Sequence, residues 1–195
     1  MFYYKDIVLE TKNAYEPAED SLLFADIINT IDMKGKKLLD MGTGTGLLAI
    51  IASKKGATVT AADIDKESLE IAEKNAENNK AVVSFVHSDL FQNINGKFDI
   101  IVFNPPYLPS DETDAYASKR TDYDGGKTGC DVINRFLISA NRHLNTAGMI
   151  LMLISSLTDK KEVARSLENN GFHYKSILSK KIDWEELSVL RISRS

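Results

Sequence analysis

The sequence predicts an α/β fold in which a mostly parallel sheet carries an antiparallel strand near its carboxyl-terminal edge. Short apolar runs alternate with segments of helical period from Lys37 to Phe103, a pattern typical of parallel strands joined by right-handed crossover helices. Two final strands are expected at about 172–180 and 186–193, and the short segment between them is mostly charged, which favours an antiparallel pair. Because no repeat, linker or low-complexity tract occurs, residues 1–195 are expected to form a single domain.

The composition favours a soluble protein of the cytoplasm. The net charge is -4 and the pI is about 5.5, which disfavours a broad phosphate-binding face. Cys130 is the only cysteine and has no His or Cys cluster near it, so we expect neither a disulfide nor a metal site. The start of the chain lacks the order of a secretory signal, and no stretch of about 18 uncharged apolar residues suggests a membrane span.

Residues 1–34 are expected to form a lead-in followed by a helix. Residues 1–16 are rich in Tyr and predict an irregular or short-stranded segment. Pro17 and the acids Glu19 and Asp20 are residues that helix starts prefer, because proline lacks the amide hydrogen that would go unpaired there and acids complement the helix dipole.

The centre and end of the chain predict alternating strands and helices. Helix 159–169 is followed by Asn170-Gly171, a typical carboxyl-terminal cap. The other expected elements are strands at 37–41, 58–62, 82–86, 98–103 and 149–154, and helices at 47–55, 66–78 and 130–143.

A long segment without periodicity, residues 108–129, interrupts this alternation. Connections of this length in compact domains are usually lids or binding loops. We therefore expect a loop on the substrate side of the site.

Three glycines, Gly42, Gly44 and Gly46, follow a strand and open a helix. Without side chains, they let a ligand approach the backbone closely. The dinucleotide-binding pattern G-x-G-x-x-G would need a glycine where Leu47 stands, so the spacing here is a different one. A tight turn without a ligand is the alternative interpretation.

Acids stand at the ends of the neighbouring strands. Asp40 lies two residues before the glycine loop, Asp63 ends the strand at 58–62, and Asp89 follows the strand at 82–86. Asp65 precedes the helix at 66–78 and is expected to cap it. Asp89 is alternatively a turn former.

The apolar run Phe98–Phe103 stops at Asn104-Pro105-Pro106-Tyr107. Proline cannot donate to a sheet ladder, so this tetrapeptide marks the carboxyl end of a strand, where open α/β sheets bind their ligands. Alternatively, the prolines only end the strand and Tyr107 packs in the core.

Asp40, Gly42–Gly46, Asp63 and Asp89 together resemble the S-adenosylmethionine site of Rossmann-like methyltransferases. The resemblance implies a seven-stranded, mostly parallel sheet with an antiparallel strand near the carboxyl-terminal edge. It also implies S-adenosyl-L-methionine as the cofactor.

Adding Asn104–Tyr107 narrows the resemblance to methyltransferases that act on amino groups. Tyr15–Asp20 upstream and Tyr123–Gly129 downstream narrow it again, to the HemK/PrmC family of protein-glutamine N5-methyltransferases. The resemblance covers nearly the whole chain.

The resemblance implies a set of cofactor contacts. Asp63 is expected to accept both ribose hydroxyls, and Asp89 to meet the adenine amino group while Leu90 or Ile64 packs on the ring. Asp40 is expected to reach the cofactor's amino group directly or through water. The expected cofactor-binding residues are Asp40, Gly42, Thr43, Gly44, Gly46, Asp63, Ile64, Asp89, Leu90 and Asn104.

On the substrate side, Asn104, Pro105 and Tyr107 are the expected catalytic residues, joined by Glu16 and Pro106 in substrate binding. The Asn104 side-chain oxygen and the Pro105 carbonyl can each accept one N–H of an acceptor amide. Tyr107 offers a flat face to a planar group. The resemblance places Glu16 near the methionine end of the cofactor or the substrate entrance, and its alternative is a simple turn residue.

Members of this family methylate the glutamine of the Gly-Gly-Gln loop in translation release factors, and the resemblance implies the same reaction here. Two alternatives keep the chemistry and change the acceptor, to an exocyclic amino group of a base in RNA or DNA, or to a protein lysine. The acidic pI and the lack of a basic stripe count against nucleic acid. An inactive cofactor-binding scaffold is a third class, which an intact Asn104–Tyr107 argues against.

Bacterial members carry an amino-terminal helical domain, whereas only residues 1–41 precede the glycine loop here. The chain is thus similar to the short archaeal and eukaryotic branch, whose members often work with a small zinc-binding activator subunit. By resemblance, the strand Val82–Val86 lies at a sheet edge, and apolar edges need a cover. We hypothesise that the activator adds a strand there, the alternative being that the chain's own loops shield it.

Overall fold

A computed structural model describes residues 1–12, 16–106, 130–182 and 185–195 of the chain. Its strands are β1 (Phe2–Tyr4), β2 (Ile7–Leu9), β3 (Lys37–Met41), β4 (Thr58–Asp63), β5 (Val83–His87), β6 (Phe98–Phe103), β7 (Leu144–Ser155), β8 (Phe172–Ile182) and β9 (Glu185–Arg194). Its helices are α1 (Glu19–Thr30), α2 (Leu47–Lys54), α3 (Lys66–Asn78), α4 (Asp131–His143) and α5 (Lys160–Asn169). Among these, no helix is both long and apolar enough to cross a membrane.

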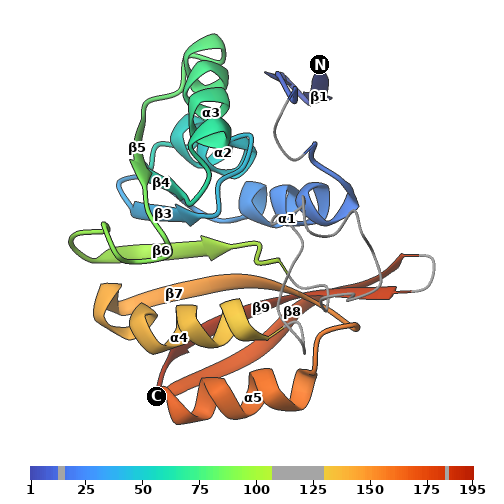
Figure 1. Ribbon diagram of the computed structural model, residues 1–195, viewed down its shortest axis with the longest axis vertical. Helices are drawn as coiled ribbons and strands as arrows, with labels where there is room; N and C mark the ends of the chain where they lie inside the picture. The colour runs from blue at the N-terminus through green and yellow to red at the C-terminus, as the bar shows by residue number, and fades with distance from the viewer. Residues whose placement is uncertain (13–15, 107–129, 183–184) are drawn as a thin grey trace. The chain divides into compact units, whose positions relative to one another are not determined.

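Seven strands form one sheet in the order β5-β4-β3-β6-β7-β9-β8, and β1 and β2 form a separate hairpin (Figure 1). β4 runs parallel to both β3 and β5, whereas β9 is antiparallel to both β7 and β8. The predicted class, a mostly parallel sheet with an antiparallel strand near the carboxyl-terminal edge, is therefore confirmed. The predicted pairing of the last two strands is confirmed as well, as β8 with β9.

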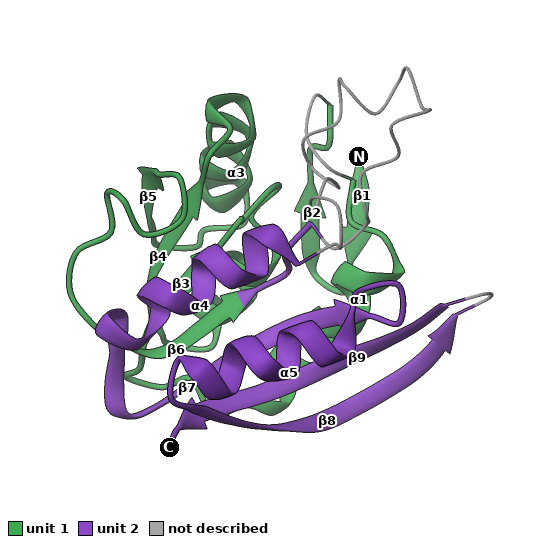
Figure 2. Ribbon diagram, turned by 60° about the horizontal axis from the view of Figure 1, so that its bottom comes forward, with its two compact units in different colours: residues 1–102 green, residues 103–195 purple. Residues whose placement is uncertain are grey.

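The chain divides into two compact units, Met1–Val102 and Phe103–Ser195 (Figure 2). Each is described by itself below. The expectation that residues 1–195 form a single domain stays a prediction.

The core of the first unit comes from strands that are apolar on both faces. Leu38 and Leu39 of β3 are both fully buried, as expected for a parallel sheet with covered faces. α1 and α2 pack side by side, and α3 packs on β4 and β5 (Figure 1). The carboxylate of Asp65 accepts the N–H groups of Glu67 and Ser68 at 3.2 and 3.0 Å, which confirms the predicted cap of α3.

In the second unit, α4 and α5 lie side by side and α5 packs on β8 (Figure 2). Phe103 stacks on Phe136 of α4, with ring centroids 4.4 Å apart. The Gly171 N–H donates to the Glu168 carbonyl at 3.0 Å with the Gly171 φ at +73°. The predicted cap at the end of α5 is thereby confirmed.

The expected start of the strand at Met149 is wrong, since β7 already begins at Leu144. The segment Asn145–Gly148 has the composition of a turn, but Leu144 at its start is fully buried. A Cβ added at Gly148 would come within 2.8 Å of Leu144 Cδ1, so the backbone bends tightly in this part of the strand. The glycine therefore marks a bend within the strand rather than the end of a loop.

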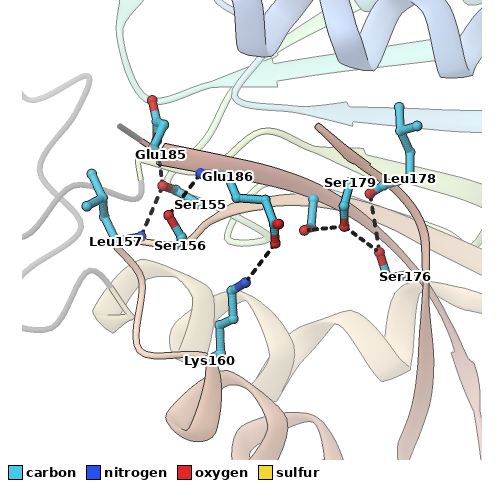
Figure 3. A network of polar contacts seen from close by, with 10 residues as sticks. Ser155, Ser156, Leu157, Lys160, Ser176, Leu178, Ser179, Glu185 and Glu186 are labelled. Atoms are coloured by element: carbon cyan, nitrogen blue, oxygen red, sulfur yellow. Dashed lines mark hydrogen bonds and ion pairs between the residues drawn. The ribbon is translucent and has the colours of Figure 1, made fainter. Parts of the chain in front are cut away.

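A polar network joins the end of β7 to the start of β9 (Figure 3). The Ser155 hydroxyl donates to the Glu185 carboxylate at 2.5 Å and accepts the Leu157 N–H at 3.1 Å. Lys160 forms an ion pair with Glu186 at 3.3 Å. These contacts fix the connection that follows β7.

Candidate active site

The glycine loop connects β3 to α2 and uses two of its glycines for different purposes. Gly46 is the N-cap of α2 in the left-handed region, with φ at +86°. A Cβ there would approach the Cβ of Ala72 to 3.2 Å, so Gly46 lets α3 pack closely on the loop. At Gly44, with φ at +52°, an added Cβ would meet no described atom within 4 Å. The backbone at Gly44 is therefore open to a ligand.

Asp63, at the end of β4, is held by two backbone groups. Its Oδ2 accepts the Gly44 N–H at 2.9 Å, and its Oδ1 accepts the Asp65 N–H at 3.0 Å. Because a carboxylate oxygen can accept more than one hydrogen bond, both oxygens retain capacity for a further donor. Burial raises the pKa of Asp63. The Asp63 carboxylate could therefore accept hydrogen bonds from two neutral hydroxyl groups, one on each oxygen.

Asp40 lies beneath the loop and is almost completely buried. Its Oδ2 accepts the Thr43 hydroxyl at 2.7 Å and the Ala49 N–H at 3.1 Å. Burial raises the pKa of Asp40 to about 7, and the negative charge of Asp63 adds to the rise. Asp40 thus braces the loop from within, a role that the sequence did not indicate.

The turn after β5 adjoins the end of β4. The Ser88 N–H donates to the Asp63 carbonyl at 2.9 Å, and the Ser88 hydroxyl donates to the Leu90 carbonyl at 2.7 Å. Leu90 has a φ of +47°, which is uncommon for a residue with a side chain. Asp89, half-buried in this turn, accepts the Gln92 side-chain amide at 3.3 Å.

A second contact ties the two strand ends together, since His87 Nε2 lies 2.9 Å from the Ile64 carbonyl oxygen. Ile64 keeps 61% of its surface exposed, which leaves its apolar side chain available to a flat ligand. The structure therefore brings Asp63, Ile64, Asp89 and Leu90 to neighbouring strand ends, as the sequence predicted. Their individual roles stay predictions.

In the second unit, Asn104 and Pro105 directly follow β6. The Asn104 Oδ1 atom and the whole of Pro105 are buried, and the Phe103–Phe136 stack anchors the residue before them. Pro106 is half-buried.

Several sequence predictions fall outside the described residues. These are Tyr107, the loop 108–129 with Tyr123–Gly129, and Tyr15. Glu16 is described: it is exposed, and its Oε2 accepts the Thr11 hydroxyl at 2.9 Å. Its place in substrate binding stays a prediction.

Asn75, which was not predicted from the sequence, is a fully buried side chain of α3 that touches the glycine loop. Its Nδ2 donates to the Thr45 carbonyl at 2.9 Å and to the Glu10 carbonyl at 3.0 Å, while its Oδ1 accepts the Glu10 N–H at 2.7 Å. The helical spacing could have indicated this role, because it places Asn75 among the small and apolar residues Leu69, Ala72 and Ala76 on the inward face of the helix. A polar side chain on such a face needs a partner.

The fold and the glycine loop define the class of protein, a Rossmann-like methyltransferase. Comparison with known proteins agrees: the methyltransferase small domain family matches residues 19–121. "Putative protein N5-glutamine methyltransferase MJ0928" of Methanocaldococcus jannaschii is 41% identical over 92% of this chain and 91% of its own length. "Methyltransferase HEMK2" of Mus musculus is 30% identical over 94% of this chain and 91% of its own length.

Among solved structures, the E. cuniculi Mtq2-Trm112 complex superposes with a TM-score of 0.75 and 29% identity. The match covers 93% of this chain and 98% of the other. That complex is described as responsible for methylation of the translation termination factor eRF1. The chain belongs to the methyltransferase small domain family and, within it, to the short HemK/PrmC-type proteins, as its motifs predicted.

Proposed function

We propose that the protein transfers a methyl group from S-adenosylmethionine to the side-chain amide nitrogen of a glutamine in the Gly-Gly-Gln loop of a translation release factor. The observation that carries the proposal is the 41% identity, over nearly the whole chain, to a protein named as an N5-glutamine methyltransferase. The name given to the E. cuniculi complex supports the same substrate class. Release factors act in the cytoplasm, so the proposal places this chain there as well.

The described residues of the first unit fit the cofactor. The backbone at Gly44 is open, and each oxygen of Asp63 can accept one further donor, which matches the two hydroxyls of a ribose. Asp89 would accept the adenine amino group, with the exposed Ile64 or Leu90 on the ring. Asp40 would address the amino group of the methionine part. When bound, S-adenosylmethionine supplies an electrophilic methyl group and leaves as S-adenosylhomocysteine.

Gly42, Thr43 and Gly46 would shape the cradle for this ligand. The Gly42 and Thr43 N–H groups both donate to the Ala62 carbonyl, at 2.8 and 3.0 Å, which ties the loop to β4. The loop is thus fixed before a ligand arrives, and little conformational entropy is lost on binding.

The task of Asn104 follows from the weakness of an amide as a nucleophile, since its nitrogen lone pair is delocalised into the carbonyl. The Asn104 Oδ1 and the Pro105 carbonyl would each accept one N–H of the glutamine amide, which turns the lone pair toward the methyl group. Both acceptors stabilise the positive charge that develops on nitrogen. The extra proton leaves to solvent after transfer, so no tuned general base is needed.

Pro106, Tyr107 and Glu16 complete the proposed substrate side. Pro106, together with Pro105, fixes the backbone φ and holds the acceptors in place. Tyr107 would offer its ring face to the planar amide. The exposed Glu16 would meet the substrate at the entrance.

The reaction is tested with radiolabelled cofactor offered to purified release factor, to its Gln→Asn loop variant, to tRNA and to duplex DNA. We expect label in the release factor alone and its loss in the loop variant. Mass spectrometry of the labelled peptide distinguishes glutamine from lysine as the acceptor. Label that enters nucleic acid and never the release factor would overturn the proposal.

We further propose that a small zinc-binding activator subunit adds a strand to β5. β5 ends the sheet order, and no described strand pairs with its outer edge. Val82, just before it, is 84% exposed, and Val83 and Phe85 are half-buried. Apolar residues on an open edge invite pairing with another chain.

Replacing Val83 by Lys tests this edge, because a charge on the added interface opposes pairing. The variant is expected to lose co-purification with the activator. Ile138→Lys is a matched control, since Ile138 is 63% exposed on α4, away from β5 in the chain. An activator that binds Val83→Lys as well as it binds the control contradicts the assignment of the edge.

A further inference from the structure

Asn75 is a fully buried amide that connects three segments of the first unit. Its backbone belongs to α3, and its Nδ2 donates to the Thr45 carbonyl of the glycine loop. Nδ2 and Oδ1 together bind the carbonyl and the N–H of Glu10. The sequence separations are 30 residues to Thr45 and 65 to Glu10.

The chemistry of an amide is needed at this position. Both Nδ2 hydrogens are donated, one to the Thr45 carbonyl and one to the Glu10 carbonyl, while Oδ1 accepts the Glu10 N–H. A carboxylate would accept the N–H but face two carbonyl oxygens, and an apolar side chain would remove the hydrogen-bond partner of three backbone groups.

The contact to Thr45 fixes the orientation of the cofactor loop. The Thr45 carbonyl and the Gly46 N–H belong to one planar peptide, and the Gly46 N–H donates to the Thr43 carbonyl at 2.8 Å. Ala72, one turn before Asn75 on α3, lies directly behind Gly46. α3 therefore supports the loop by packing at Ala72 and by hydrogen bonding at Asn75.

The contact to Glu10 fixes the chain before α1. Asn79, one turn after Asn75, holds Val8 of β2 in the same way: its Oδ1 accepts the Val8 N–H at 3.1 Å and its Nδ2 donates to the Val8 carbonyl at 2.8 Å. The two asparagine side chains thus hydrogen-bond the backbone N–H and carbonyl groups of Val8 and Glu10, as a neighbouring strand would. Only Asn75 also reaches the glycine loop.

We propose that Asn75 is a positioning residue that couples cofactor binding to the ordering of Val8–Lys12. The inference rests on the proposed function, because it takes S-adenosylmethionine as the ligand of the glycine loop. Thr11 in turn binds Glu16, so the coupled segment leads to the proposed substrate entrance. Since coupling free energies are reciprocal, a cofactor that gains affinity from an ordered Glu10 must in turn stabilise that order.

Isothermal titration of S-adenosylmethionine to Asn75→Ala and Asn79→Ala separates coupling from folding. Each variant loses two hydrogen bonds to the β2 segment, and only Asn75→Ala also loses the bond to the loop. We expect Asn75→Ala to raise the Kd about tenfold or more, a value typical of coupled sites, and Asn79→Ala to change it less than about twofold. Asn75→Ser, which leaves room for a bridging water, replaces Asn75→Ala should that variant not fold.

Hydrogen exchange of the wild-type protein, compared with Asn75→Ser, tests reciprocity. Saturating cofactor is expected to slow exchange of the Glu10 amide several-fold, and this protection should vanish in Asn75→Ser. Equal Kd changes in the two alanine variants, or an unchanged Glu10 amide in the wild type, would overturn the coupling alone. A wild-type protein that does not bind the cofactor would overturn the proposed function together with the inference.

Discussion

Two regions of the molecule place carboxylates near strand ends and treat them differently. Near the glycine loop, Asp40 and Asp63 accept hydrogen bonds from backbone N–H groups and the Thr43 hydroxyl, and no described cation pairs with either. Between β7 and β9, Glu186 pairs with Lys160 and lies at the surface (Figure 3).

This difference distinguishes the proposed binding site from a structural network. A buried charge without a counter-charge costs stability, and burial accordingly raises the pKa of both Asp40 and Asp63. Such groups are retained mainly where a ligand uses them. In the Lys160–Glu186 pair the two charges neutralise each other and remain in contact with solvent. We therefore assign this pair only a structural role in the connection after β7.

The largest expected effect is on kcat and lies within the second unit, where a substitution of Asn104 should lower kcat strongly and a substitution of Glu186 should not change it. Asn104→Ala is expected to lower kcat about a thousandfold, or about 4 kcal/mol of transition-state stabilisation, because it removes an acceptor aimed at the developing charge. Cofactor affinity should stay within about tenfold, since the proposed partner of Asn104 is the acceptor nitrogen and not the cofactor. Single-turnover methylation and isothermal titration measure the two quantities.

A collapse of cofactor binding in Asn104→Ala would instead show that Asn104 serves mainly the cofactor. The matched control is Glu186→Gln, which is expected to leave both kcat and the Kd unchanged.

Asp63→Ala is expected to raise the Kd for S-adenosylmethionine about a hundredfold, or about 2.7 kcal/mol, because the two proposed hydroxyl contacts would be lost. Asp63→Asn keeps one acceptor oxygen, so its Kd should lie between that of the wild type and that of the alanine variant. Isothermal titration at one pH and ionic strength provides the comparison. An Asp63→Ala variant that binds within threefold of the wild type would mean that this buried carboxylate only fixes the backbone of Gly44.

Asp40 yields a prediction about pH because its folded pKa of about 7 lies above that of the unfolded chain, near 3.8. The folded protein binds the proton more tightly, so the Asp40 contribution to stability is fully present below pH 4 and is lost as the pH rises to 7. Relative to Asp40→Asn, the free energy of unfolding of the wild type should fall by up to about 1.4 kcal/mol per pH unit in that window.

Urea unfolding of both proteins at pH 5, 6, 7 and 8 measures this difference. Asparagine can still accept the Thr43 hydroxyl and the Ala49 N–H through its oxygen, so both proteins are expected to fold. A difference that does not change between pH 5 and pH 7 would show that Asp40 is already ionised at the lower pH.

Much of the fold was predictable because local chemistry and global fold agree. Buried strands such as β3 and β6 are short, mostly apolar runs. Asp65 precedes a helical pattern that it caps, and Gly171 follows the last turn of α5. The placement of Asp63 and Asp89 at neighbouring strand ends was predictable as well, because parallel strands bring their carboxyl ends to one edge.

What the sequence did not reveal depends on contacts between distant residues. Leu144 is fully buried and its side chain lies close to Gly148, and no local pattern distinguishes the segment between them from a turn. The Asn75 contacts span 30 and 65 residues. The cofactor contact expected of Asp40 stays a prediction, whereas its bonds to Thr43 and Ala49 depend on how the loop folds over it.

The smallest expected effect concerns the ion pair of the β7–β9 network. Lys160 and Glu186 are each 48% exposed in their side chains, so their attraction is screened and offset by lost side-chain entropy. A double-mutant cycle with Lys160→Met and Glu186→Gln is expected to give a coupling below about 1 kcal/mol in urea unfolding. Cofactor affinity should not change in any member of the cycle. A coupling above about 2 kcal/mol, or a shift in the Kd, would place this pair among the functional charges and remove the distinction between the two regions.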